Sequence, residues 1–144
     1  MRINRSSTFV ASIAGLALIA SACGGGSSAG EGDVQVTLKD FQIDLSASTV
    51  SAGDVTFDAS NEGPSVHEFE IFSVPDGVDP TDLPVESNVA DTESQGLEVI
   101  DEVEDIAPAT TASLTVSLEP GSYALICNLS EHYEQGMRIP FTVE

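Results

Sequence analysis

The sequence is poor in basic residues, and it is equally poor in the residue types that bind soft metals. Of its 144 residues, four are lysine or arginine, two are histidine, two are cysteine and two are methionine. So few basic side chains exclude nucleic acid as a partner, because phosphate binding needs a basic surface. The apolar run at residues 9–20 is shorter than the roughly 20 residues that a membrane-spanning helix needs.

That apolar run is better explained as part of an export signal. Arg2 and Arg5 precede it, and small residues follow it. A basic start, a short apolar stretch and a small-residue cleavage site are typical of a secretory signal peptide, which we assign to residues 1–22. A membrane-spanning helix is the weaker alternative.

Cys23 directly follows the predicted cleavage site. Small residues followed by cysteine resemble the lipobox of bacterial lipoproteins, in which that cysteine becomes the lipidated N-terminus. Ala20 stands where the motif usually has leucine, and a secreted protein cut near Ala22 is the alternative. Residues 23–33 are rich in glycine and serine and are expected to form a flexible linker, which leaves residues 34–144 as one domain.

Charge is strongly one-sided in the predicted mature chain. Lys39 and Arg138 are its two basic residues against 24 acidic ones, which gives a net charge of −22. An anionic lipid surface would repel such a domain, so we expect membrane attachment through the lipid anchor alone. The acidic surface either steers the protein to a partner with a basic patch or serves solubility in a salty habitat.

The domain is predicted to be all-β, as a β-sandwich, because short apolar–polar alternations recur between turn signals. The clearest alternations are at Val34/Val36/Leu38, Val55/Phe57/Ala59 and Leu114/Val116/Leu118. A change of phase after Lys39-Asp40 suggests a bulge or a strand that crosses between sheets. Residues 97–106 are expected to form an edge strand. Residues 73–96 contain three prolines and are expected to form a long surface loop, with a short helix near residues 85–91.

Four scarce residues fall in two places: His67 in one predicted strand, and Cys127, His132 and Met137 in one short segment. An exported cysteine without a disulfide partner is buried, reactive or metal-bound. Each residue alone has an ordinary structural explanation, such as a buried apolar side chain for the cysteine or a core filler for the methionine. Those explanations leave the spacing of four residues between successive members of the segment unexplained.

Two imidazoles, one thiolate and a weak thioether are the ligands of an electron-transfer copper site. Cys127 ends a strand, and the following loop must curl over one ion to return His132 and then Met137. Gly136 supplies backbone freedom just before Met137. Zinc fits less well, since methionine is not among its usual ligands. We therefore predict one copper ion held by His67 and these three residues.

The same residues resemble a known family, the cupredoxins. The resemblance rests on His67-Glu68-Phe69 and on Cys127-x₄-His132-x₄-Met137. Its loop spacing is most similar to the rusticyanin, sulfocyanin and auracyanin branch, and it implies a Greek-key sandwich and a cycle between Cu(I) and Cu(II). Ser130-Glu131 departs from the Pro-Gly that relatives often have, which puts the potential and the acid behaviour in doubt.

Two neighbours are predicted to support the ligands. The backbone N–H of Glu68 is expected to donate to the Cys127 sulfur. Asn128 is expected to tie the ligand loop to the strand of His67, with an ordinary turn residue as the alternative. The glycosylation pattern that begins at Asn128 is discounted beside such a site.

The function predicted is a type 1 (blue) copper protein that carries single electrons as a monomer on the extracytoplasmic face of the cell membrane. A copper chaperone or store is the main alternative, and an adhesion module with incidental copper is a third. No enzyme is expected, because both histidines are used by one site and none remains for a catalytic set or a further metal centre.

Overall fold

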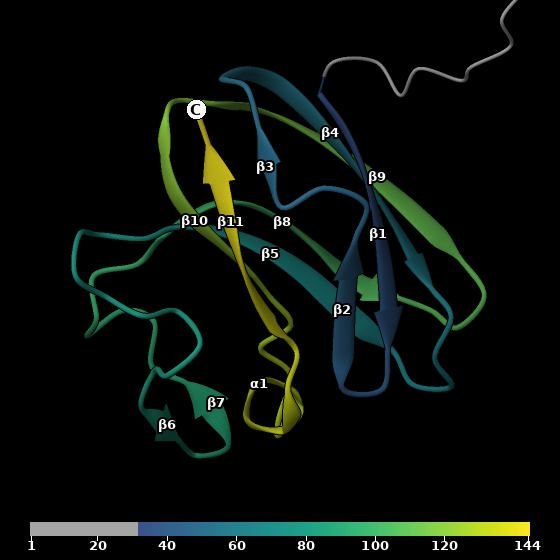
Figure 1. The fold of residues 1–144 in the computed structure, drawn as a ribbon. Helices are drawn as coiled ribbons and strands as arrows, with labels where there is room; N and C mark the ends of the chain where they lie inside the picture. Colours follow the sequence, from purple (N-terminus) through teal and green to yellow (C-terminus); the bar gives the residue numbers. More distant parts are fainter. Residues whose placement is uncertain (1–31) are drawn as a thin grey trace, which may run out of the picture.

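The computed structural model describes residues 32–144, whose strands form two facing sheets (Figure 1). One sheet has the order β2 (Gln42–Leu45), β1 (Asp33–Lys39), β4 (Gly53–Asn61), β9 (Thr111–Leu118). The other has the order β3 (Thr49–Val50), β11 (Arg138–Val143), β10 (Gly121–Ile126), β5 (His67–Ser73), β8 (Glu98–Ile106). The predicted all-β sandwich is confirmed. The predicted signal peptide, Cys23 and most of the predicted linker lie outside the described residues.

The main core fills the space between the two sheets. Val34, Val36 and Leu38 of β1 are buried at every second position, as their alternation predicts. Phe57 of β4 joins the layers, because its ring lies 5.6 Å from that of Phe69 and 5.4 Å from that of Phe141 between centroids. Aromatic contacts at these distances add to the free energy gained by burial.

Within the described residues, no helix has the length and apolar character of a membrane span.

The change of phase after Lys39 has a different cause from the one predicted. β1 and β2 form an antiparallel hairpin in one sheet, with Lys39 opposite Gln42. Asp40 and Phe41 form the two-residue turn, and Phe41 has a φ of 76°. The prediction of a bulge or a crossing between sheets is wrong, since the chain folds back here and the paired Leu38 and Ile43 share the inner face.

The segment between β5 and β8 covers the outer face of the five-stranded sheet and encloses a second core. Its members are the buried side chains of Phe72, Leu83, Ala90, Leu97, Ala124, Ile126 and Tyr133. Where a helix was expected, the chain forms a small hairpin of β6 (Val85–Glu86) and β7 (Val89–Ala90). Ser87 and Asn88 at its tip have φ values of 53° and 71°. Two successive positive φ angles make the tight turn of a hairpin and exclude a right-handed helix.

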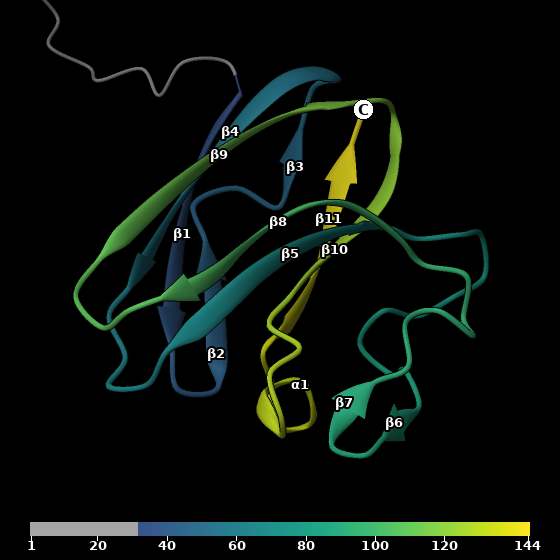
Figure 2. The same cartoon turned by 180° about the vertical axis from the view of Figure 1, so that it is seen from behind.

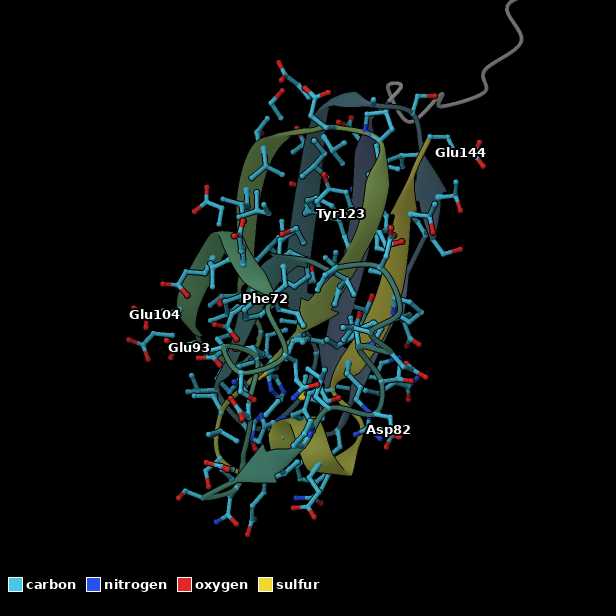
Figure 3. The ribbon with its side chains drawn as sticks, turned by 90° about the vertical axis from the view of Figure 1, so that its left-hand side faces the viewer. Phe72, Asp82, Glu93, Glu104, Tyr123 and Glu144 are labelled. Atoms are coloured by element: carbon cyan, nitrogen blue, oxygen red, sulfur yellow. The ribbon has the colours of Figure 1, made fainter. Side chains whose placement is uncertain are left out.

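The edge-strand prediction for residues 97–106 is confirmed by β8, which pairs with β5 and ends the five-stranded sheet. Acidic side chains occupy much of this edge, and Glu104 points outward into solvent (Figure 3). Charges on an edge strand oppose pairing with another chain.

The two ends of the sandwich differ in what they carry. β1 begins at the end where Glu144 lies, and the helix α1 (His132–Gln135) lies at the opposite end beside β7 (Figures 1 and 2). We call these the entry end and the α1 end. Since His132 is the first residue of α1, the predicted metal site lies at the α1 end.

Candidate metal centre

Strand ends and one short loop position the four predicted ligands. His67 is the first residue of β5, and Cys127 directly follows β10. His132 opens α1, and Met137 lies between α1 and β11. Since β5 and β10 are neighbours in one sheet, a sequence separation of 60 residues between His67 and Cys127 becomes a direct contact.

The donor atoms of His67, Cys127 and His132 all lie within 4.8 Å of one another. Nδ1 of His67 lies 3.2 Å from Nδ1 of His132, and the Cys127 sulfur lies 3.3 Å from Nδ1 of His132 and 3.9 Å from Nδ1 of His67. With bonds of about 2.0 Å to nitrogen and 2.3 Å to sulfur, as zinc forms, a trigonal plane separates its donors by roughly 3.5–3.7 Å. The three donors are thus spaced to surround one metal ion.

Burial differs among the predicted ligands in a way that gives the site one open side. His67, Cys127 and Met137 are each 0% exposed, and Met137 belongs to the same core cluster as Cys127. His132 is only half-buried. His132 is therefore the member through which the cluster meets the solvent.

Backbone hydrogen bonds close the ligand loop on itself. Cys127 N–H donates to Met137 O at 3.1 Å, and Met137 N–H donates to His132 O at 3.0 Å. Gly136 has a φ of 132°, and a Cβ there would lie 2.7 Å from Phe41 O. The predicted role of Gly136 is confirmed, because this position requires glycine both for its conformation and for the close approach of the β1–β2 turn.

Glu68 contacts the loop through both its backbone and its side chain. Its N–H donates to the Cys127 sulfur at 3.4 Å, as predicted, and its carboxylate accepts the Asn128 N–H at 2.7 Å. Burial raises the pKa of the Cys127 thiol to about 11. Because a soft metal binds the thiolate, loading this site must release a proton.

Asn128 ties the ligand loop to the strand of His67, as predicted, through the bond from its backbone N–H to the Glu68 carboxylate. The side chain instead pairs with β7: Ala90 N–H donates to Asn128 Oδ1 at 2.7 Å, and Asn128 Nδ2 donates to Ala90 O at 3.2 Å. Asn128 therefore fixes the ligand loop to the segment that covers the sheet.

Tyr133 and Glu131, which were not predicted to hold the ligand loop, also do so. The Tyr133 hydroxyl accepts the Leu83 N–H and donates to Pro80 O, both at 2.8 Å. Glu131 takes a left-handed conformation, with φ 71°, and its N–H donates to Asn88 O at 2.7 Å. The Pro-Gly that the family resemblance implies at Ser130-Glu131 was the signal that the second position needs a glycine-like φ.

The β1–β2 turn approaches both histidines. Nε2 of His67 lies 3.1 Å from a carboxylate oxygen of Asp40, and the Phe41 ring meets the His132 ring edge-on at 5.6 Å. A hydrogen bond from Ser65 lowers the pKa of Asp40. Burial, and then the nearby His132, lower the pKa of His67.

A second group of carboxylates lies on the outer face, across β5 and β8. Glu70 is paired in register with Glu102. Burial, then the charges of Glu68 and Glu102, raise the pKa of Glu70 to about 8. Its Oε2 atom is buried without a hydrogen-bond partner among the described residues. This group lies on the opposite face of β5 from His67, since side chains alternate along a strand.

Comparisons with known proteins agree with this fold. Residues 9–139 match the cupredoxin-like domain family. Reduced auracyanin from Roseiflexus castenholzii superposes with a TM-score of 0.58 at 19% identity, over 78% of this chain and 96% of that one. A laccase from Pediococcus acidilactici gives a TM-score of 0.51 at 16% identity, over 83% of this chain and 28% of that one.

A curated relative is the iron uptake system component EfeO of Yersinia pseudotuberculosis. It is 31% identical over 96 residues, which are 67% of this chain and 20% of EfeO. The chain thus spans about a fifth of the length of the curated relatives that it matches.

Proposed function

The chain belongs to the family of cupredoxin-like domains, and from that premise we propose that it is a type 1 copper protein that carries single electrons. The observation that carries the proposal is the cluster of His67, Cys127 and His132, whose donor atoms lie within 4.8 Å of one another at the α1 end. Such a His₂Cys set with a methionine as weak fourth ligand is the donor set of electron-transfer copper.

The protein's own residues would supply the ligands for copper in both oxidation states. The two imidazoles and the thiolate supply the strong donors, and Met137 supplies the weak one. Bound copper would supply the one-electron Cu(I)/Cu(II) couple. Because β5, β10 and the closed loop fix the donors, the ligands need to move little when the charge changes.

One experiment tests the copper assignment against its main alternative, a copper chaperone or store. Cu(II) is added to the purified protein, and a visible spectrum and a potential are recorded. An intense thiolate-to-copper band with reversible one-electron cycling supports the carrier, and Cys127→Ser should abolish that band. Copper uptake without the band or the cycling would favour the chaperone, although three fully buried donor residues are poorly placed for exchange.

Electron transfer is proposed to run through His132, the half-buried ligand. Phe41, 37% exposed, lies edge-on against its ring. Glu131 and Glu134 are exposed beside it. An apolar contact ringed by carboxylates suits a redox partner with a basic patch, and opposite charges raise association rates most strongly at low salt.

A stopped-flow salt series on wild type and on a Glu131→Lys, Glu134→Lys variant tests the partner proposal. The rate with a cationic cytochrome should fall as salt rises, and the variant should be slower at low salt. A flat dependence in the wild type would leave solubility as the explanation of the acidic surface.

The proposed location is the extracytoplasmic face of the cell membrane, with lipid on Cys23 as the only attachment and the domain monomeric. The support is the sequence pattern of residues 1–23. Metabolic labelling with a radioactive fatty acid should label wild type and leave Cys23→Ser unlabelled. Equal labelling of both would contradict the anchor.

We propose a carrier and not an enzyme. The laccase that shares the fold is a much longer chain, of which this sequence covers 28%. Both histidines of the present sequence lie in one cluster, so the sequence holds no imidazoles for a second copper centre. Oxygen consumption by the copper-loaded protein with phenolic substrates should stay at the level of free copper controls.

A further inference from the structure

We propose that Asp40 is a positioning residue that fixes the orientation of His67 and selectively stabilises the oxidised state of the site. This inference rests on the proposed copper function. It assigns a role to the β1–β2 turn, which contributes none of the four ligands.

The contact places a carboxylate behind a ligand imidazole. The Nε2–H of His67 donates to Asp40 Oδ1 at 3.1 Å, while the other oxygen of Asp40 accepts the Ser65 hydroxyl at 2.8 Å. With its proton on Nε2, His67 presents the lone pair of Nδ1 to Cys127 and His132. A carboxylate bonded to the distal nitrogen of a metal-binding histidine fixes the tautomer and strengthens the imidazole as a donor.

The surrounding chain is shaped for this pair. Gly63 packs directly against it, and a Cβ there would lie 2.7 Å from Asp40 Oδ1 and 3.0 Å from His67 Nε2. Real Cβ atoms essentially never approach other atoms closer than 3.0 Å. A side chain at position 63 would therefore force the carboxylate and the imidazole apart.

Asn61 holds the segment that contains Gly63 and Ser65. This side chain is 1% exposed. It accepts the Gly63 N–H at 2.9 Å and donates to Ser65 O at 2.7 Å and to Ile106 O at 2.8 Å. A buried amide that makes three hydrogen bonds fixes the backbone of this segment. Asp40 is therefore held against His67 by the Ser65 hydroxyl on one side and by the packing of Gly63 on the other.

The negative charge of Asp40 acts on the His67 imidazole. Lys39, which precedes Asp40 in the sequence, pairs with Asp44 at 3.3 Å. His67 is fully buried and the Asp40 side chain is 25% exposed, so water screens the pair only from one side. A negative charge behind a ligand favours Cu(II) over Cu(I), which lowers the reduction potential.

Asp40→Asn is the direct test, because it keeps the size of the side chain and an acceptor oxygen but removes the charge. Asp54→Asn is the matched control, because it removes one carboxylate charge from an exposed residue at the start of β4, outside the metal site. Loss of a carboxylate that supports a metal-binding histidine typically weakens metal affinity by about 10–100-fold. We expect Asp40→Asn to weaken Cu(II) binding about tenfold more than Cu(I) binding, which for one electron raises the potential by about 59 mV. Asp54→Asn should change the ratio less than twofold.

A second measurement needs no copper. In the metal-free protein, the Nε2 proton of His67 should give a downfield proton resonance that exchanges slowly with water, and Asp40→Ala should lose it. If wild type shows this proton but no blue band, the copper function fails and the hydrogen bond stands. If wild type is blue and Asp40→Asn keeps the potential of Asp54→Asn, or if the slow proton is absent, the role of Asp40 is overturned.

Discussion

The hydroxyl of Tyr133 offers a sharp test of how the covering segment holds the ligand loop. Tyr133 is 2% exposed, and its oxygen accepts the Leu83 N–H and donates to Pro80 O. Tyr133→Phe removes this oxygen alone and leaves a buried N–H without a partner. A buried polar group left unsatisfied costs about 1–3 kcal/mol, and a lost hydrogen bond costs about 1 kcal/mol. We therefore expect the free energy of unfolding to fall by about 2–3 kcal/mol.

Tyr123→Phe is the matched control, since it removes the other tyrosine hydroxyl of the sequence. That hydroxyl donates one bond, at 2.9 Å, to the carbonyl of the exposed residue Glu119, where water can replace it. The expected loss is about 0.5–1 kcal/mol. Urea denaturation of both metal-free variants gives the comparison, and for a domain of this size Tm should fall by about 4–8 °C per kcal/mol. The reasoning is refuted if Tyr133→Phe costs no more than Tyr123→Phe.

Three further outcomes are expected. Met137→Leu should keep copper bound and raise the reduction potential, because loss of a weak axial donor favours Cu(I); voltammetry that shows a lower potential would contradict the weak-ligand role. Glu70→Gln should flatten the dependence of stability on pH, because burial raises the pKa of Glu70 from 4.5 to about 8. The stability that protonated Glu70 contributes to the folded protein is fully present below about pH 4.5 and is lost as pH rises through about 8. Denaturation midpoints between pH 4.5 and pH 8.5 should thus fall less in the variant than in wild type, and equal slopes would rule the explanation out. Glu131→Gly should stabilise the protein by up to about 1 kcal/mol, since φ at this position is 71° and a left-handed conformation costs a non-glycine residue about 1–2 kcal/mol; thermal unfolding measures it, and any loss of stability would show that the Glu131 side chain contributes more than its strain costs.

Scarcity made the cluster predictable. With two histidines and one cysteine besides Cys23 in the sequence, few combinations of residues could form a metal site. The regular spacing from Cys127 to Met137 left one combination, which is the predicted ligand set. Asp40 carried no comparable signal. It is one of 24 acidic residues, and only the fold brings it to His67, across a separation of 27 residues.

The errors arose where a local pattern had two physical solutions. Reversal of the apolar phase after Lys39 fits a bulge, and it fits equally a tight hairpin, which Asp40 and Phe41 form. The helix expected near residues 85–91 competed with a turn at Ser87-Asn88, and packing of Ala90 in the second core favours the hairpin. The bond from the Asn128 side chain to Ala90 was not predicted, because no sequence rule placed β7 beside the ligand loop.

The separation of the entry end from the α1 end sets the direction from which an electron can arrive. β1 runs from one to the other (Figure 1), and its seven residues span about 23 Å at roughly 3.3 Å per residue. If lipid on Cys23 attaches the chain to a membrane, His132 lies at the end of the domain opposite the attached end of β1. A partner diffusing in the outer medium then reaches the site without hindrance. A partner embedded in the same membrane reaches it only when the domain turns about the predicted flexible linker, residues 23–33.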